Sequence, residues 1–440
     1  AVKGFQAKLN HQRAYDFLNY GIFDHTEETL YRHVHQIRGG HFAEINLKEK
    51  KFSIQRWYTL PRETNTLSYE EAVIKCRALL TDAVALRLRS DVEVGSCLSG
   101  GIDSSSIVCL AAQALKETGL RQKSFSARSE DPRIDEYRFM ETVRAQSGTD
   151  AFYVTPDADG LLKNFNTMLW HQDEPFASSS VFAQWALFSK VKQERIKVML
   201  DGQGADEQLG GYYEFYGVYL KQLLKEGSLA CLFKEFHLRS FLKELIPDRV
   251  KEHILYWLNK PSLKCPWIDF KVLLCEEKAP FHRKHQSFRN YSEEMLLHSN
   301  LPMLLHYEDR NSMAHSVESR TPFLDYRFVE FILNLPAGFL LRKGVTKAIL
   351  RDAMRGIVPE DVLNRRDKVA FATDEKKWLG GIHKESFMKA VKDVVNETKI
   401  LKPAIISKTE AILDGKKPFS FLPFRVIAFG EWMKLNAVKL

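Results

Sequence analysis

The sequence predicts an α/β fold built on a doubly wound parallel sheet, with a largely helical C-terminal part and a small β-rich segment in front. Short apolar runs recur between residues 92 and 200, and each leads through a polar or glycine-rich loop into a helical pattern. Strand–loop–helix units in series favour a parallel sheet, because right-handed crossovers return the chain to the same sheet. Beyond Gly211 the pattern is mostly helical, whereas the first 60 residues show the alternation of strands.

The first 60 residues are predicted to form one short helix and then two strands. Ala14 to Asn19 suggests a short helix, and residues 41–47 and 51–58 alternate apolar and polar side chains around a polar corner. A segment of this size is too small to hold a hydrophobic core by itself. Residues 61–68 are polar and begin with proline, so we expect a linker there.

Residues 69–440 are predicted to form the main domain, which starts with a helix. Ser68 precedes an acidic first turn and is a good N-cap for a helix that runs to about Arg87. The elements of the sheet then follow in chain order: a strand at 92–98, a helix at 107–115, a strand at 123–127, a helix at 137–146 and a strand at 196–200. The short apolar strands are typical of a sheet that is buried on both faces.

Composition restricts the classes of protein. Of 440 residues, 45% are hydrophobic and 27% are charged, and no apolar run is long enough to span a bilayer, so a membrane protein and a mostly disordered chain are excluded. Six cysteines without a CxxC pair argue against a disulfide scaffold or a cysteine-built zinc site, and we expect a cytoplasmic protein. Half of the net charge of +8 lies in residues 221–295, where a solvated helical surface is favoured over a nucleic-acid site.

The first motif with chemical meaning is Ser99-Gly100-Gly101-Ile102-Asp103-Ser104-Ser105, between a predicted strand and a predicted helix. Two glycines let backbone N–H groups face an anion, the hydroxyls add donors, and the helix N-terminus adds positive charge. Asp103 fits a phosphate site if Mg²⁺ bridges its carboxylate and the phosphates. The alternative is a glycine turn with polar residues that cap the helix. The motif lacks the G-K-[ST] of a Walker loop, which argues against a kinase-like or GTPase site.

A second loop, acidic and rich in glycine, follows the last predicted strand: Asp201-Gly202-Gln203-Gly204-Ala205-Asp206-Glu207, then Gly210-Gly211-Tyr212. By itself it fits either an ordinary acidic turn or a metal-binding loop. Because loops after parallel strands leave the same edge of a sheet, the two loops should face one crevice. Asp103 and Asp206 are then expected to share the metal ions of one polyphosphate.

Together these residues resemble a known family. The S-G-G-x-D-S loop is similar to the pyrophosphate-binding loop of the ATP pyrophosphatases, which cleave ATP to AMP and pyrophosphate. The loop at 201–212 is similar to the second ATP-site loop of the asparagine synthetases. Further similar motifs follow in the same order: Asp173-Glu174-Pro175, Ser179-Ser180, Asp309 to His315, Glu318 to Asp325, and Arg365 to Phe371. The resemblance covers roughly residues 70 to 375 and implies a sheet of the ATP-pyrophosphatase type.

The resemblance implies an ATP site formed by Leu98, Ser99, Gly100, Gly101, Asp103, Ser104, Ala127, Asp201 and Gly202. Adenosine would lie against Leu98 and Ala127, and pyrophosphate against the loop that starts at Ser99. Asp103 and Asp206 would hold Mg²⁺. The residues implied to bind the other substrate are Ser179 and Ser180.

Three residues are implied to take part in catalysis: Lys368, Gln203 and Glu318. Lys368 matches the family's lysine at the reacting phosphate, where an ammonium stabilises developing negative charge; without the resemblance, a surface charge is the simpler interpretation. Gln203 stands where the family often carries glutamate, so it can hydrogen-bond the substrate but cannot supply charge. Glu318 either orients the nucleophile or only pairs with a base such as Arg320.

The function implied is ATP-dependent amide synthesis. The side-chain carboxylate of aspartate would attack the α-phosphate of Mg·ATP to give β-aspartyl-AMP and pyrophosphate, and ammonia would then give asparagine and AMP. A β-lactam synthetase-like enzyme that adenylates a different carboxylate is the alternative, although lactam formers tend to carry tyrosine at the position of Gln203. The intact motifs disfavour a non-catalytic ATP-binding module, and the lack of a cysteine pair disfavours a tRNA-thiolating relative.

The start of the sequence bears on the nitrogen donor. The family's glutaminase half has an N-terminal cysteine, whereas residue 1 here is alanine, and residues 1–60 resemble only the tail of that half. We therefore expect a chain without glutaminase activity of its own, which is either a piece of a longer protein or depends on free ammonia or a partner subunit. The sequence is also compatible with a homodimer.

Overall fold

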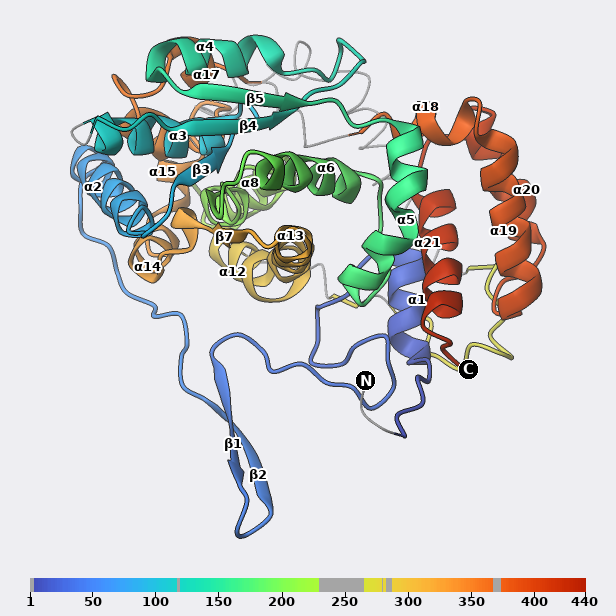
Figure 1. Cartoon of the computed structure of the whole chain (residues 1–440). Coiled ribbons are helices and arrows are strands. Elements are labelled where there is room, and N and C mark those ends of the chain that lie inside the picture. The colour runs from blue at the N-terminus through green and yellow to red at the C-terminus, as the bar shows by residue number, and fades with distance from the viewer. Residues whose placement is uncertain (1–3, 117–118, 229–264, 279, 282–286, 367–372) are drawn as a thin grey trace.

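A computed structural model describes residues 4–116, 119–228, 265–278, 280–281, 287–366 and 373–440 (Figure 1). Its centre is a sheet of five parallel strands in the order β5-β4-β3-β6-β7. The strands are β3 (Val94–Cys97), β4 (Lys123–Ala127), β5 (Asp150–Val154), β6 (Val198–Leu200) and β7 (Glu318–Arg320). The chain adds strands first on one side of β3 and then on the other, so the predicted doubly wound parallel sheet is confirmed.

Helices cover both faces of the sheet. Along β6, Val198 and Leu200 belong to the core on one face, and Met199 belongs to the core on the other. The first core includes α2 (Tyr69–Arg87), α3 (Ile102–Lys116) and α4 (Tyr137–Ser147), and the second includes α6 (Ser180–Gln193). Figure 1 shows α4 on one side of the strands and α6 on the other. With both faces covered, the ends of the strands are the places where loops can form a site.

Most of the predicted elements are present near their predicted positions. α2 begins with a capping box, in which Ser68 Oγ accepts from the Glu71 N–H and the Glu71 carboxylate accepts from the Ser68 N–H. β4 spans the predicted residues, and β3, β6, α3 and α4 overlap theirs. The sequence analysis did not find β5 and β7. β7 has only three residues, two of them charged, so it gives no apolar run, and β5 follows α4 after only two residues, so its short apolar run is not set apart from the helix.

A helical body beside the sheet includes both the first and the last helix of the chain. α1 (His11–Tyr20) contacts α21 (Leu422–Leu435), which also contacts α5 (Ala158–Gln172) and α19 (Lys384–Thr398). Their apolar side chains form one core, which is distinct from the cores on the sheet. The predicted N-terminal helix is confirmed, whereas the predicted domain boundary at residues 61–68 stays a prediction.

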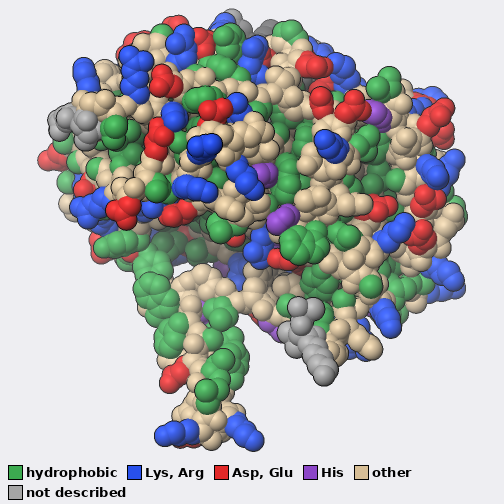
Figure 2. Space-filling view, viewed as in Figure 1, with side chains coloured by type: hydrophobic (Ala, Val, Ile, Leu, Met, Phe, Trp, Pro, Cys, Tyr) green, Lys and Arg blue, Asp and Glu red, His purple; other side chains and the backbone are tan. Residues whose placement is uncertain are grey.

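β1 (His41–Asn46) and β2 (Lys51–Arg56) form the predicted antiparallel hairpin, which projects from the molecule (Figure 1). One face of the hairpin is apolar, because Ile45 pairs with Phe52 and Ala43 pairs with Ile54. Ile45, Phe52 and Ile54 are exposed, and Figure 2 shows hydrophobic groups along the projecting arm. An isolated two-stranded sheet has little stability of its own.

The other helices within the described residues are α7 (Ala205–Leu209), α8 (Glu214–Lys225), α12 (Phe288–Glu294), the π-helix η1 (Met295–Ser299), α13 (Leu301–Ala314), the 3-10 helix η2 (Pro322–Leu324), α14 (Tyr326–Leu333), α15 (Ala337–Leu340), α16 (Ala348–Ala353), α17 (Glu360–Leu363), α18 (Glu375–Gly380) and α20 (Ala404–Leu413). The part after Gly211 is therefore largely helical, as predicted. Among the described helices, none combines the length and the apolar character that a bilayer crossing requires. Much of the basic stretch 221–295 lies outside the described residues.

Candidate active site

The loops that follow β3 and β6 meet at the carboxyl end of the sheet. The two strands are parallel neighbours, so both loops leave the same edge, as the sequence predicts. They touch at Gly202, where a Cβ would lie 3.3 Å from the Asp103 Cβ and 3.4 Å from the Ser104 nitrogen. The order of strands reverses between β3 and β6, and open α/β sheets bind their ligands at such a switch point.

The loop after β3 is held by hydrogen bonds among its own polar groups. Ser104 Oγ accepts from the Ser99 N–H at 3.1 Å and lies 3.0 Å from Ser99 Oγ, which accepts from the Gly101 N–H at 3.3 Å. Gly100 has a φ of 79°, and a Cβ there would lie 2.9 Å from the Phe139 Cβ, so this position requires glycine. The loop leads directly into α3, whose N-terminus adds positive charge. These features suit an anion.

A lysine that the sequence analysis did not find links the two loops. Lys347 Nζ lies 2.5 Å from Asp103 Oδ2 and 2.6 Å from Asp206 Oδ1, and the residue is only 4% exposed. Burial by itself would lower the pKa of Lys347, but the two carboxylates raise the pKa above its ordinary value. The close approach of Asp206 and Lys347 requires glycine at position 211, because a Cβ there would lie 1.7 Å from Asp206 Oδ1 and 2.4 Å from Lys347 Cε.

This arrangement fits the predicted magnesium site. Asp103 and Asp206 come from different loops, yet their carboxylates converge on one point, where the Lys347 ammonium supplies a positive charge. Carboxylate oxygens are the protein ligands that Mg²⁺ prefers. The two residues assigned to the metal are therefore brought together, and a cation is already accommodated between them.

Two further acids lie close together at the second loop: Asp201, which begins the loop, and Glu308, which is buried beside it. Asp201 Oδ1 accepts from the Gln203 N–H at 3.1 Å, and burial raises the pKa of Asp201. Glu308, on α13, is 2% exposed, and its carboxyl group is hydrogen-bonded by the side chains of Ser319 and Gln203. Burial and the nearby Asp201 raise the pKa of Glu308 well above its usual value. Gln203 is thus placed against a buried carboxyl group that the sequence analysis did not single out.

Glu318 is not brought together with the loops. It is the first residue of β7 and pairs with Val198, the first residue of β6, so it lies at the amino end of the sheet. Its carboxylate is exposed and lies 2.6 Å from Arg320 Nε, which is the ion pair that the sequence left open as an alternative. Lys368 lies outside the described residues.

Ser179 and Ser180 lie at the N-terminus of α6, and their polar groups bond to nearby protein groups. Ser179 is fully buried, its N–H donates to Glu375 Oε2 at 2.6 Å, and its hydroxyl lies 2.6 Å from Thr373 Oγ1. Ser180 Oγ lies 2.6 Å from Ser178 Oγ. Burial raises the pKa of Glu375 to about 7.

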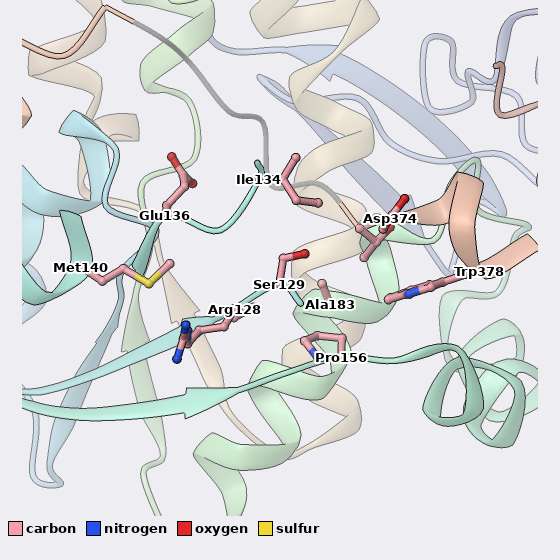
Figure 3. Close-up of a pocket in the computed structure, with 11 residues that line it drawn as sticks. Arg128, Ser129, Ile134, Glu136, Met140, Pro156, Ala183, Asp374 and Trp378 are labelled. Atoms are coloured by element: carbon pink, nitrogen blue, oxygen red, sulfur yellow. The ribbon is translucent and has the colours of Figure 1, made fainter. Parts of the chain in front are cut away.

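A small cavity opens beside the carboxyl ends of β4 and β5 (Figure 3). Figure 3 shows Arg128, Ser129 and Pro156 on the strand side and Trp378 on the helical side. Ala127 and Thr373 also line it, which places this cavity between a predicted adenosine contact and the partner of Ser179. Leu98, the other predicted adenosine contact, is buried, and its N–H donates to the Phe125 carbonyl oxygen of the neighbouring strand.

Arg365 adds a second buried cation near the first loop. Its Nη1 lies 2.5 Å from Glu136 Oε1 and 3.5 Å from the Gly100 carbonyl oxygen. The guanidinium also stacks over the Phe139 ring, 4.2 Å from the centroid. The sequence analysis used Arg365 only as part of a motif, since nothing in a run of charged residues shows which one is buried.

Comparison with known proteins identifies the family. The asparagine synthase family matches residues 75–433. The chain belongs to the asparagine synthase family. It is 26% identical to the amidase chyE of Penicillium rubens over 80% of this chain and 60% of that protein. It is also 26% identical to asparagine synthetase [glutamine-hydrolyzing] 1 of Bacillus subtilis, over 84% of this chain and 60% of that protein.

The chain thus spans about 60% of the length of these members of the asparagine synthase family. Among solved structures, NMN synthetase from Francisella tularensis is 16% identical to this chain. That match has a TM-score of 0.22 and covers 33% of this chain and 59% of that one. The five-stranded parallel sheet with loops at a switch point is the architecture that the resemblance to the ATP pyrophosphatases implies.

Proposed function

We propose that this chain catalyses ATP-dependent amide formation, in which a carboxylate is activated as an acyl-adenylate and then attacked by ammonia. The observation that carries the proposal is the convergence of Asp103, Lys347 and Asp206 where the two glycine-rich loops meet. This cluster combines a loop suited to phosphates with two carboxylates suited to Mg²⁺. Membership in the asparagine synthase family supports the same chemistry.

In this proposal the phosphates bind to the loop after β3. Ser99, Gly100, Gly101 and Ser104 supply hydroxyl and backbone donors, and α3 directs its N-terminus toward the same place. Asp103 and Asp206 hold Mg²⁺, which would neutralise part of the phosphate charge. Lys347 holds the two carboxylates close to each other and supplies a fixed positive charge beside the loop.

The acyl side of the proposed reaction uses residues nearer α6 and α18. Ser179 and Ser180 are the proposed contacts of the carboxylate substrate. The proposed contacts of adenosine are Leu98, Ala127, Asp201 and Gly202. The cavity that Ala127 lines leads from the adenosine contacts toward Ser179 and Ser180. Gln203 would orient the substrate by hydrogen bonds, since its amide carries no charge. Lys368 stays a proposed participant from the family resemblance, whereas Glu318 lies at the amino end of the sheet and has no role in this proposal.

We propose aspartate as the carboxylate and asparagine as the product. A second candidate is a related enzyme that adenylates a different carboxylate, as in the β-lactam synthetases. The specific observation that favours this candidate is that an amidase and an asparagine synthetase are equally similar to the chain, both at 26% identity. A glutaminase partner or domain, a cytoplasmic location and a homodimer remain proposals of the same kind.

Carboxylate-dependent exchange of pyrophosphate into ATP tests the proposal. We expect exchange with aspartate and none without a carboxylate, and asparagine should form when ammonium is added. Exchange with a different acid from a panel, and not with aspartate, would support acyl-adenylate formation and show that aspartate is not the substrate. The absence of exchange with every acid would contradict the proposed function.

A further inference from the structure

A second cluster of ionisable groups lies away from the two loops and comes from three separate parts of the chain. Asp24 follows α1, Glu174 lies between α5 and α6, and His306 lies on α13. Each offers one ligand atom, and these atoms all lie within 4.8 Å of one another. Asp24 is 6% and Glu174 is 4% exposed. The proposed function uses none of these three residues.

The hydrogen bonds of His306 determine which ring nitrogen carries a proton. Its Nε2 lies 2.8 Å from the Gln172 carbonyl oxygen, which can only accept, so Nε2 is the donor. Nδ1 then faces Asp24 Oδ2 at 2.8 Å. Two acceptors at this distance repel each other unless a proton or a metal ion lies between them.

The surroundings favour a dication over a single proton. Glu174 brings a second carboxyl group to the same point, and its Oε1 accepts from the Leu30 N–H at 2.5 Å. A proton on Nδ1 would compensate only one of the two carboxylates. The Arg38 guanidinium is also near, but it donates to the backbone oxygens of Asp24, Thr26 and Leu297. A divalent ion would balance both acids.

The geometry around the imidazole is also that of a metal ligand. Histidines that bind metals usually donate their other N–H to a backbone carbonyl or a carboxylate, which fixes the ring. The Gln172 carbonyl does this for His306, and the Phe23 ring packs edge-on against the imidazole, 5.1 Å between centroids. The ring is thus held with Nδ1 directed at the two acids.

We propose that Asp24, Glu174 and His306 form a site for a divalent transition metal of the Zn²⁺ class. One imidazole nitrogen and two carboxylate oxygens are a ligand set that Zn²⁺ accepts, with a water as fourth ligand, whereas Mg²⁺ prefers oxygen alone. Metal–ligand bonds of about 2.0–2.2 Å place neighbouring ligands ~3.3 Å apart, so Nδ1 and Oδ2 need to separate only slightly. The metal would fasten the segment after α1 to α13 and to the end of α5.

The test is zinc binding to the chelator-treated chain, measured by calorimetry and by metal analysis in excess Mg²⁺, which saturates the Asp103–Asp206 site. We expect one zinc ion per chain. Glu174→Gln keeps an oxygen for the Leu30 N–H but removes the charge, and should weaken zinc binding by about tenfold or more. Asp24→Asn should do the same, which covers the case in which one variant does not fold.

Glu375→Gln is the matched control, because Glu375 is also a buried glutamate that accepts a backbone N–H, and burial raises its pKa, like that of Glu174, to about 7. This variant should bind zinc as the unaltered chain does. If the unaltered chain binds no zinc, the cluster is only a buried ion pair and the proposal is wrong. Equal losses in Glu174→Gln and Glu375→Gln would also overturn it. Asp103→Asn should keep zinc binding, so this result is independent of the proposed ATP site.

Discussion

Two clusters in this molecule each bring two carboxyl groups together, and they differ in the source of the positive charge. At the switch point, Asp103 and Asp206 share the ammonium of Lys347, which the chain itself provides. Between α1 and α13, Asp24 and Glu174 share one imidazole, which supplies at most a single charge. In the first cluster the chain itself neutralises part of the negative charge before any Mg²⁺ binds, whereas the second cluster relies on an added ion to balance both acids. The comparison suggests that resident and recruited cations serve the same electrostatic need.

The largest expected effect is the loss of the resident cation. Lys347→Met removes a buried cation from between two half-buried carboxylates and should destabilise the fold by about 2–3 kcal/mol in urea unfolding, less than for fully buried acids because water reaches both groups. Mg²⁺ should raise the unfolding midpoint of this variant more than that of the unaltered chain. Lys399→Met is the control, because Lys399 also has a left-handed backbone conformation but is exposed. Equal stability of the two variants would show that Lys347 does not stabilise the Asp103–Asp206 cluster.

Removal of the Asp103 carboxylate should lower the rate of pyrophosphate exchange. Asp103→Asn keeps the shape of the side chain but halves the charge that faces Mg²⁺, so pyrophosphate exchange should fall by about 10²–10³-fold. Asp150→Asn, at the amino end of β5, should leave exchange unchanged, since its carboxylate lies at the opposite end of the strands and pairs with Arg121 on the surface. Normal exchange in Asp103→Asn would refute the metal role.

Glu375 shows what happens to a buried acid that has no cation within bonding distance among the described residues. Burial raises the pKa of Glu375 to about 7, compared with about 4.5 in the unfolded chain. Once the group is fully ionised, this difference lowers the free energy of unfolding by roughly 3 kcal/mol. The cost is absent below pH 4.5 and grows as the pH rises to about 7. Glu375→Gln should therefore match the unaltered chain at low pH and be more stable at pH 8. Parallel pH profiles of the two unfolding midpoints would contradict this account.

The smallest expected effect concerns the space around the lysine. In Gly211→Ala the new Cβ would overlap Asp206 Oδ1 and Lys347 Cε, so the cluster must shift, at a cost of about 1–3 kcal/mol and with reduced exchange. Gly217→Ala, in α8, meets no atom within 4 Å and should stabilise the helix by up to about 1 kcal/mol. We expect the thermal unfolding midpoint to fall in Gly211→Ala and to rise in Gly217→Ala. A change in the same direction in both variants would contradict the steric role of Gly211.

The sequence was most informative where local patterns and local chemistry coincide. The N-cap at Ser68, the strand at Lys123–Ala127 and the two glycine-rich loops were each predicted from adjacent residues. β7 could not be predicted in this way, because a strand of three residues with two charges is stabilised by its position at the sheet edge. The predicted roles of Lys368 and Glu318 stay predictions.

The sequence by itself determined the parallel sheet, three of its five strands and the two loops, because these follow from periodicity and from glycine and acidic residues at short spacing. Only the tertiary structure selected Lys347 from 64 basic residues, placed Glu308 beneath Gln203, and joined Asp24, Glu174 and His306. The physical reason is burial: a charge is strongly affected by its neighbours only when water is excluded, and packing between distant segments decides where that happens.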